Sequence, residues 1–398
     1  MSLMLTNSGV TGNARARDQA YKGRGAALNI EGRFEQWQRA AFDDGWQAPA
    51  EDETETVPLK TVITKETAKS IISENDSPDI PFRYSLNPYR GCEHGCIYCF
   101  ARPTHAYLGL SPGLDFETRI FAKTNAPQLL RAELSKPSYK SDVISVGVIT
   151  DAYQPCERKY TLTRQCLEIM SEFNQPVALI TKSALIERDI DILQSMAKRN
   201  LVHVTISMTT QDHHISRYLE PRTAAPARRL QTIRRMADAG IPVGINVAPV
   251  IPFLTDHELE TLLEAGRDHG AVTAGYVMLR LPWELKTLFR NWLETHFPLK
   301  AAHVMSRVQE MHGGNGRDYD SSFGTRMTGQ GIFAELLKQR FAKACARLRL
   351  NSADNSAFSS ADNRADNSTH DTTGRWQIQR LDRSQFCVPG RAVQGALF

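Results

Sequence analysis

Long apolar runs are absent from this chain of 398 residues, and cysteine is scarce, with seven residues in all. No stretch approaches the roughly 20 apolar residues that a membrane-spanning helix needs. The first residues, Met1–Ser8, have neither the basic start nor the apolar core of a signal peptide. A small, odd number of cysteines in a long chain argues against a disulfide framework. We therefore expect a cytoplasmic protein in a reducing compartment, with no membrane partner.

The overall composition is ordinary for a soluble globular protein, with 41% hydrophobic and 23% charged residues. The net charge of +4 does not by itself indicate a class of partner, but positive charge is concentrated in one segment. Between residues 217 and 235 a single acid, Glu220, stands among six arginines: Arg217, Arg222, Arg228, Arg229, Arg234 and Arg235. Such a cluster suits phosphate or carboxylate groups, and for most of the six a solvated helix face is the alternative.

Composition changes along the chain and predicts six segments. The first is polar and without periodicity, and the fifth is of low complexity, with Ala-Asp-Asn three times over. The expected boundaries are 1–35 for a mobile N-terminal segment, 36–82 for a lead-in that packs on the main domain, 83–312 for the main domain, 313–350 for a helical extension, 351–373 for a disordered linker and 374–398 for a tail.

Within the main domain, short apolar runs alternate with helical stretches. The runs cover residues 143–149, 177–181, 202–207, 243–247 and 275–279. Helices are expected between them, for example over Glu187–Arg199 and Ala227–Ala239, and a capping box at Thr255–Glu258 opens another. Near-continuous apolar strands alternating with helices indicate parallel strands that are buried on both faces. With the strand before residue 92 there are six βα units, two short of a closed barrel.

Three cysteines fall within eight residues, Cys92, Cys96 and Cys99, in the pattern C-x3-C-x2-C. Three thiolates so close together cannot all pair with one another, but they can hold three corners of a metal cluster. A [4Fe–4S] cluster normally takes four cysteine ligands, so three leave one iron free to bind something that reacts. The alternative is a structural zinc site with His94 as the fourth ligand, although zinc sites usually combine two ligand pairs far apart in sequence.

The spacing of these cysteines, with residues 87–91 before and 100–105 after them, resembles the radical S-adenosylmethionine (SAM) enzymes, and most closely their spore photoproduct lyase-like branch. The resemblance covers roughly residues 60–345. It implies an α/β fold, a partial (β/α)6 TIM-like barrel with its chemistry at the carboxyl ends of the strands. It also implies a [4Fe–4S] cluster whose open iron binds SAM. Reduction by an external low-potential electron donor would cleave SAM to a 5′-deoxyadenosyl radical that abstracts hydrogen from a substrate.

The resemblance also implies roles for residues at the strand ends. Tyr98 stands where the family carries an aromatic residue beside the adenine, although simple packing explains it equally well. Thr150 and Asp151 follow the second strand, where family members contact the SAM amino group, but the glycine-rich form of that motif is missing here. Lys182 and Ser207 end the third and fourth strands and match residues that contact SAM. An ordinary loop role is the alternative for each.

Two further residues are candidates near the same edge. Arg222, in a Glu-Pro-Arg segment that resembles one in the family, could clamp a carboxylate or phosphate with two hydrogen bonds. Cys156 follows the second strand, and the lyase uses a cysteine as hydrogen donor to its product radical. The residues around Cys156 do not reproduce the lyase motif, so an inert cysteine near a helix start is the alternative.

The last five residues suggest a partner. Gln394, Leu397 and Phe398 form a Gln-x-x-Leu-Phe pattern that resembles the peptide with which bacterial proteins bind the DNA polymerase sliding clamp. A flexible tether before them would make the peptide reachable. The alternative is a tail that folds back on the barrel.

The sequence therefore predicts a radical SAM enzyme that acts on nucleic acid, in DNA repair or base modification. A second hypothesis keeps the SAM chemistry but takes a peptide or small metabolite as substrate. A third is a metal-stabilised nucleic-acid-binding protein that is not an enzyme. Because substrate specificity depends on variable rim loops, the sequence does not name the substrate.

Overall fold

The structure, a computed structural model, describes residues 21, 23–34, 59–314, 316–352 and 380–390. Its centre is one curved sheet with the strand order β2–β3–β6–β7–β8–β9–β10, in which β2 is an antiparallel edge and the other six strands are parallel. The strands are β2 (Ile72–Glu74), β3 (Tyr84–Leu86), β6 (Ile144–Val146), β7 (Val177–Thr181), β8 (Val202–Met208), β9 (Val243–Val250) and β10 (Thr273–Met278). The predicted fold class, an α/β partial (β/α)6 barrel, is confirmed.

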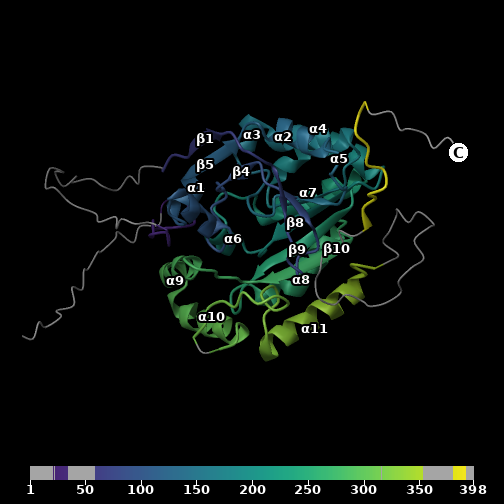
Figure 1. The fold of residues 1–398 in the computed structure, drawn as a ribbon. Helices are drawn as coiled ribbons and strands as arrows, with labels where there is room; N and C mark the ends of the chain where they lie inside the picture. The colour runs from purple at the N-terminus through teal and green to yellow at the C-terminus, as the bar shows by residue number, and fades with distance from the viewer. Residues whose placement is uncertain (1–20, 22, 35–58, 315, 353–379, 391–398) are drawn as a thin grey trace, which may run out of the picture.

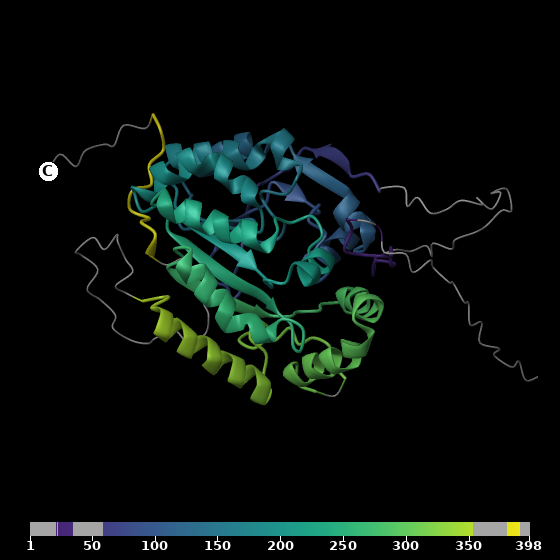
Figure 2. The same cartoon turned by 180° about the vertical axis from the view of Figure 1, so that it is seen from behind.

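Helices from between the strands cover one face of this sheet (Figure 1 and, from behind, Figure 2). They are α2 (Ala126–Leu134), α4 (Leu162–Glu172), α5 (Ile190–Ala197), α7 (Pro226–Asp238) and α8 (Leu259–Asp268). The face under the helices carries apolar side chains, and Val204, Ile206 and Val247 are at most 1% exposed. The opposite face of β8 and β9 is also buried but carries polar side chains, among them Ser207 and Asn246. The main core is this layer between sheet and helices.

A second, smaller sheet, which was not predicted, is formed by β1 and by two strands within the connection between β3 and β6. It has the order β1 (Val62–Glu66), β5 (Arg119–Lys123) and β4 (Tyr89–Arg90). Strand β4 has only two residues, and β1 and β5 each contain two charged residues, so none of the three stands out as an apolar run. As a result, the cysteines follow β4 rather than the first barrel strand directly. Short elements complete the domain: η1 (Arg102–Leu108), α1 (Leu114–Thr118), α3 (Glu157–Tyr160), η2 (Ala184–Asp189), α6 (His213–Leu219) and η3 (Asp256–Glu258).

Three helices extend the fold beyond β10: α9 (Leu285–His296), α10 (Pro298–Met311) and α11 (Gly331–Leu348). Helix α10 packs on α9, and α11 packs on α8, so the extension covers the β10 side of the sheet (Figure 1). Among the described residues, no helix combines the length and the apolar character required to cross a membrane.

Two local predictions are wrong. Thr255 and Glu258 do not form a capping box, because the Thr255 hydroxyl accepts the amide of Ile251 and Glu258 binds the Thr210 hydroxyl. A 3-10 turn therefore precedes α8, which begins at Leu259. The helix predicted over 187–199 is likewise divided into η2 and α5.

Part of the predicted tail is ordered against the amino ends of the strands. The amide of Asp382 donates to the carbonyl of Asn200, just before β8, at 2.9 Å. The amide of Cys387 donates to the carbonyl of Phe173, before β7, at 3.0 Å. Most of the linker predicted over 351–373, and the clamp-like peptide at the end of the chain, lie outside the described residues.

Candidate active site

The cysteine loop, residues 91–101, follows β4 and carries three thiols that form no disulfide. Cys92 is 7% and Cys96 8% exposed, and Cys99 is half-buried. Burial raises the pKa of all three thiols, and with the nearby carboxylate of Glu220 it brings that of Cys96 to about 12. Since thiolates are the metal-binding form, a metal has to displace these protons when it binds.

A buried ion pair stabilises the conformation of the cysteine loop. Arg102 and Glu117 are both fully buried, and their side chains meet at 3.0 Å. Arg102 also donates to the carbonyl of Gly95, at 2.8 Å, and to that of Cys96, at 2.9 Å. A guanidinium presents several donors in a fixed fork, so one side chain sets the path of the loop between two cysteines.

The N-terminal segment, residues 23–34, packs against the cysteine loop from outside. The amides of Gly25 and Ala26 donate to the carboxylate of Glu117 at 3.0 and 2.9 Å. Gly25 lies so close that an added Cβ would come within 1.8 Å of the Gly95 carbonyl oxygen. Only glycine permits this approach of two backbones.

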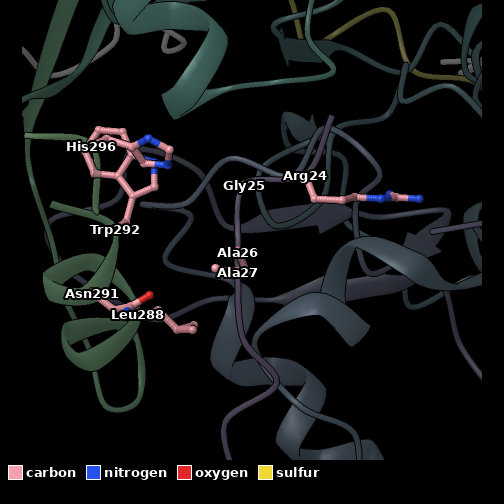
Figure 3. A pocket seen from close by; sticks show the side chains of 8 residues that line it. All are labelled: Arg24, Gly25, Ala26, Ala27, Leu288, Asn291, Trp292 and His296. Carbon is pink, nitrogen blue, oxygen red and sulfur yellow. The ribbon is translucent and has the colours of Figure 1, made fainter. Parts of the chain in front are cut away.

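The same segment closes the space between the loop and helix α9. Figure 3 shows residues 24–27 passing beside Trp292 and His296 of α9, with a small pocket between them. Residues 23–34, part of the segment 1–35 for which mobility was predicted, thus have packing partners in the structure. The physical reason is that buried Glu117 supplies acceptors to amides of this segment, a long-range partnership that composition does not reveal.

Lys182, Ser207 and Asn246 lie in a row across three neighbouring strands, at the carboxyl ends of β7 and β8 and in the middle of β9. Ser207 is paired with Asn246 in the β8–β9 register, and Lys182 directly follows β7. The Lys182 amine donates to the Ser207 hydroxyl at 2.8 Å and lies 5.8 Å from the centre of the Tyr98 ring. Asn246 is 3% exposed, and its Oδ1 has no hydrogen-bond partner among the described residues. The row thus offers an amine, a hydroxyl and a free amide oxygen.

Asp151 joins the cysteine loop to this row. Its carboxylate accepts the Thr181 hydroxyl at 2.7 Å and the Lys182 amide at 2.8 Å, and it lies 3.3 Å from Nδ1 of His94. Burial alone would raise the pKa of Asp151, but His94 and these hydrogen bonds hold it at about 2. The hydroxyl of Thr150 donates to a main-chain oxygen of β4 at 3.0 Å. Both residues position the strand ends, and their contacts with SAM stay predictions.

Tyr98 is attached to a buried acid behind the cysteine loop. Its hydroxyl donates to Glu220, and the other oxygen of that carboxylate pairs with Arg229 of α7. Burial alone would raise the pKa of Glu220, but Arg229 and Lys182 hold it at about 2. This network fixes the orientation of the Tyr98 ring. A contact between the ring and adenine stays a prediction.

The arginine-rich segment is largely paired within the protein. Arg229 is 1% exposed and neutralises Glu220. Arg228 and Arg235 both form ion pairs with Glu187. Only Arg229 is therefore part of the core. The alternative of a solvated position fits the four arginines that are exposed, which are Arg217, Arg222, Arg234 and Arg235.

Arg222 contacts the cysteine loop directly, whereas Cys156 lies in a buried apolar cluster. The amide of Arg222 donates to the carbonyl of His94 at 3.3 Å, and its partly exposed guanidinium lies 3.9 Å from Glu93. Cys156 is 4% exposed, and burial raises the pKa of its thiol. Its apolar neighbours in the same cluster are Tyr89, Ile120, Ala122 and Leu162. The anion clamp and the hydrogen donor stay predictions.

The side chains present fit a [4Fe–4S] cluster with SAM beside it. Thiolates are the ligands of such clusters, and three come from one short loop. SAM carries a carboxylate, an amino group and ribose hydroxyls, which match the Lys182 amine, the Ser207 hydroxyl and the unpartnered Asn246 oxygen. Within the described part of the chain, no three or more His, Cys, Asp or Glu side chains are grouped to hold a single metal ion.

Three parts of this site were missed from the sequence. The Arg102–Glu117 pair and the Glu220–Arg229 pair look like ordinary surface charges until the fold buries them. Asn246 did leave a signal, because it is a polar residue inside the apolar run 243–247. A polar side chain in a strand that is buried on both faces needs a partner, so its presence there points to a site.

Comparison with known proteins agrees with this geometry. The model of the Radical SAM superfamily matches residues 86–266. Uncharacterized protein Rv2578c of Mycobacterium tuberculosis is 34% identical over 273 residues, which cover 68% of this chain and 76% of that protein. Uncharacterized protein MJ0683 of Methanocaldococcus jannaschii is 26% identical over 239 residues, covering 60% and 85%.

Solved structures share the fold. A spore photoproduct lyase mutant aligns with a TM-score of 0.53 at 15% identity, covering 72% of this chain and 79% of that one. Another mutant of the lyase, with bound AdoMet and dinucleoside spore photoproduct, aligns with a TM-score of 0.52 at 14% identity over the same shares. The chain thus belongs to the radical SAM superfamily of enzymes, whose cofactors are a [4Fe–4S] cluster and SAM, and has the fold of the spore photoproduct lyase-like branch.

Proposed function

We propose that Cys92, Cys96 and Cys99 ligate the [4Fe–4S] cluster and that SAM lies between the cluster and the row Lys182–Ser207–Asn246. The observation that carries this proposal is the position of Lys182 over the ring of Tyr98, the residue between the second and third cysteines. When bound, the cluster and SAM together supply a 5′-deoxyadenosyl radical for hydrogen abstraction from a substrate.

The chain's own residues bind and orient SAM. The Lys182 ammonium neutralises a carboxylate, while one of its three N–H groups donates to the Ser207 hydroxyl oxygen and so fixes the position of the amine beside β8. The Asn246 oxygen accepts from an amino or hydroxyl group. Asp151, held ionised, fixes the Lys182 backbone through its amide.

Burial around the cysteine loop keeps water from the reacting groups. Tyr98 is 8% exposed, and two of the three thiols are similarly covered. Shielding from solvent is one of the levers that set the potential of an iron–sulfur cluster, and this chemistry requires a low one. The reducing electron comes from an external low-potential donor.

For the substrate we propose a nucleic acid, with a lyase-like DNA repair or base modification as the reaction. Support comes from the shared fold with a solved lyase that holds a dinucleoside spore photoproduct. A peptide or small metabolite is the alternative substrate. The non-enzymatic alternative is removed by membership in the superfamily.

The hydrogen-donor role of Cys156 and the clamp peptide belong to the same proposal. If Cys156 donates hydrogen to a product radical, Cys156→Ala changes the product distribution while SAM cleavage continues. If Gln394, Leu397 and Phe398 form a clamp peptide, a synthetic copy of the tail binds the bacterial clamp and competes with other clamp ligands. No binding by that peptide would remove the clamp as a partner.

Cluster ligation is tested by anaerobic reconstitution with iron and sulfide. The protein should turn brown and bind four irons per chain, as a [4Fe–4S] centre requires. Replacing all three of Cys92, Cys96 and Cys99 by Ala should abolish both signals. Cys345→Ala is the matched control, because this cysteine is also buried but lies on α11. A colourless protein that binds zinc instead would contradict the assignment.

A further inference from the structure

Four exposed aromatic side chains gather near the cysteine loop, and we call them the aromatic rim. Their exposed fractions are 52% for Phe34, 41% for Phe100, 67% for Tyr107 and 60% for Trp283. They come from the N-terminal segment, the cysteine loop, η1 and the loop between β10 and α9. Large rings gathered in this way on a surface mark an interaction site more often than isolated ones do.

Arg33 holds three of these rings together. Its guanidinium carbon lies 4.9 Å from the ring centre of Phe34, 5.2 Å from that of Tyr107 and 4.1 Å from that of Trp283. The charge of Arg33 is already balanced by Glu284, at 3.1 Å. Arg33 therefore acts as a spacer between rings whose other surfaces stay exposed.

Trp283 keeps its exposed position at a conformational cost. Its φ of +48° is in the left-handed region, which a bulky side chain rarely adopts. Because the Trp283 side chain is 60% exposed, packing in the core does not compensate for this strain. Such strained positions concentrate at functional sites.

Arg280, on the same loop, is an arginine whose donors are poorly satisfied. Its guanidinium lies 4.7 Å from the ring centre of Phe100, the residue after Cys99. One of its nitrogens contacts the thioether of Met327 at 3.1 Å. Its Nε is buried and has no hydrogen-bond partner among the described residues. A guanidinium with unsatisfied donors is suited to bind an oxyanion such as a phosphate, which accepts two hydrogen bonds at once.

We infer that Arg280 and the aromatic rim bind a single nucleic-acid strand at the mouth of the barrel. A backbone phosphate satisfies Arg280, and unpaired bases stack on the exposed rings. Stacking on aromatic side chains beside a cationic group is how proteins hold single strands with little sequence preference. Enzymes that act on a base also remove it from the duplex, so the bound strand is unpaired there. This inference rests on the proposed nucleic-acid substrate and identifies how the strand is held.

The test is binding of a fluorescently labelled oligothymidylate to the full chain with its cluster reconstituted, followed by anisotropy at several salt concentrations. Trp283→Ala and Tyr107→Ala should each weaken binding about tenfold, whereas Trp283→Phe, which keeps a ring, should bind nearly as the parent does. Arg280→Gln should weaken binding and lower the slope of log K against log salt by about 0.7, the value for one phosphate contact on a single strand.

Phe323→Ala is the matched control. Phe323 is 60% exposed and packs on Arg326 at 4.9 Å, but Arg326 is already paired with Asp79. This variant should bind like the parent, and thermal unfolding of every variant shows whether it is folded. An RNA oligonucleotide measured in parallel distinguishes DNA from RNA as the preferred strand.

Two results would overturn the inference. One is equal affinity of the parent and all folded rim variants, which would show that nucleic acid binds elsewhere. The other is no binding of either oligonucleotide by a protein that still cleaves SAM, which would favour a peptide or metabolite and leave the radical SAM chemistry intact. Failure of the parent to cleave SAM would instead contradict the proposed function itself.

Discussion

The amine of Lys182 donates a hydrogen bond to the hydroxyl of Ser207 at 2.8 Å, across the ends of two neighbouring parallel strands. These residues are 25 positions apart in sequence and meet only because β7 and β8 are in register. The same amine lies over Tyr98 of the cysteine loop. This contact links the row of polar strand ends to the loop that carries the three cysteines.

Loss of the Lys182 charge should weaken SAM binding. Lys182→Met removes a hydrogen bond to a charged group, and such bonds contribute about 1.5–3 kcal/mol, so we expect roughly tenfold to hundredfold lower affinity. Equilibrium dialysis with reconstituted protein measures this. Lys198→Met, at an exposed lysine at the end of α5, is the control and should bind SAM normally. Equal affinities for the two variants would exclude Lys182 from the SAM site.

Breaking the Arg102–Glu117 pair should destabilise the protein strongly. Glu117→Gln leaves a buried guanidinium without its counter-ion, and removing one member of a buried pair costs about 3–5 kcal/mol. Glu172→Gln breaks the exposed pair with Arg131 and should cost at most about 1 kcal/mol. Chemical denaturation compares the two variants. Similar midpoints would mean that the buried pair does not anchor the loop.

Gly25→Ala should displace the N-terminal segment from the cysteine loop. The added methyl group would collide with the Gly95 carbonyl, and overpacking of this kind costs about 1–3 kcal/mol. We expect faster loss of iron to a chelator, followed by the fading of cluster absorbance. Gly23→Ala is the control. Gly23, unlike Gly25, has a left-handed φ of +76°, so alanine adds backbone strain there, but its methyl group meets nothing within 4 Å. If both variants lose iron at the parent's rate, the segment does not protect the cluster.

Glu220 should make stability depend on acid pH. Its pKa is lowered from 4.5 to about 2 in the folded protein, so its contribution is complete above pH 4.5 and is lost as the pH falls towards 2. Glu220→Gln removes that dependence and also leaves Arg229 buried without its partner, at a cost on the order of 3 kcal/mol at neutral pH. Urea unfolding at a series of pH values tests this. A variant with the parent's acid profile would show that another group is responsible.

The sequence predicted those parts of the structure that depend on local pattern. Apolar runs revealed the barrel strands because both faces of each strand are buried, and the three cysteines are adjacent in sequence. The parts that were missed depend on distant partners. Gly25 and Glu117 are 92 residues apart, and Tyr98 and Glu220 are 122 apart. An arginine or glutamate gives no local signal that it will be buried, since burial becomes favourable only when the fold supplies the opposite charge.

The most direct test of the central claim is reductive cleavage of SAM by the anaerobically reconstituted protein. With a strong chemical reductant, the parent should release 5′-deoxyadenosine and methionine, measured by liquid chromatography and mass spectrometry. The triple variant Cys92→Ala, Cys96→Ala, Cys99→Ala should release none, while Cys345→Ala should behave like the parent. Absence of 5′-deoxyadenosine from a parent protein with a full complement of iron, or equal amounts from the triple variant, would contradict the account.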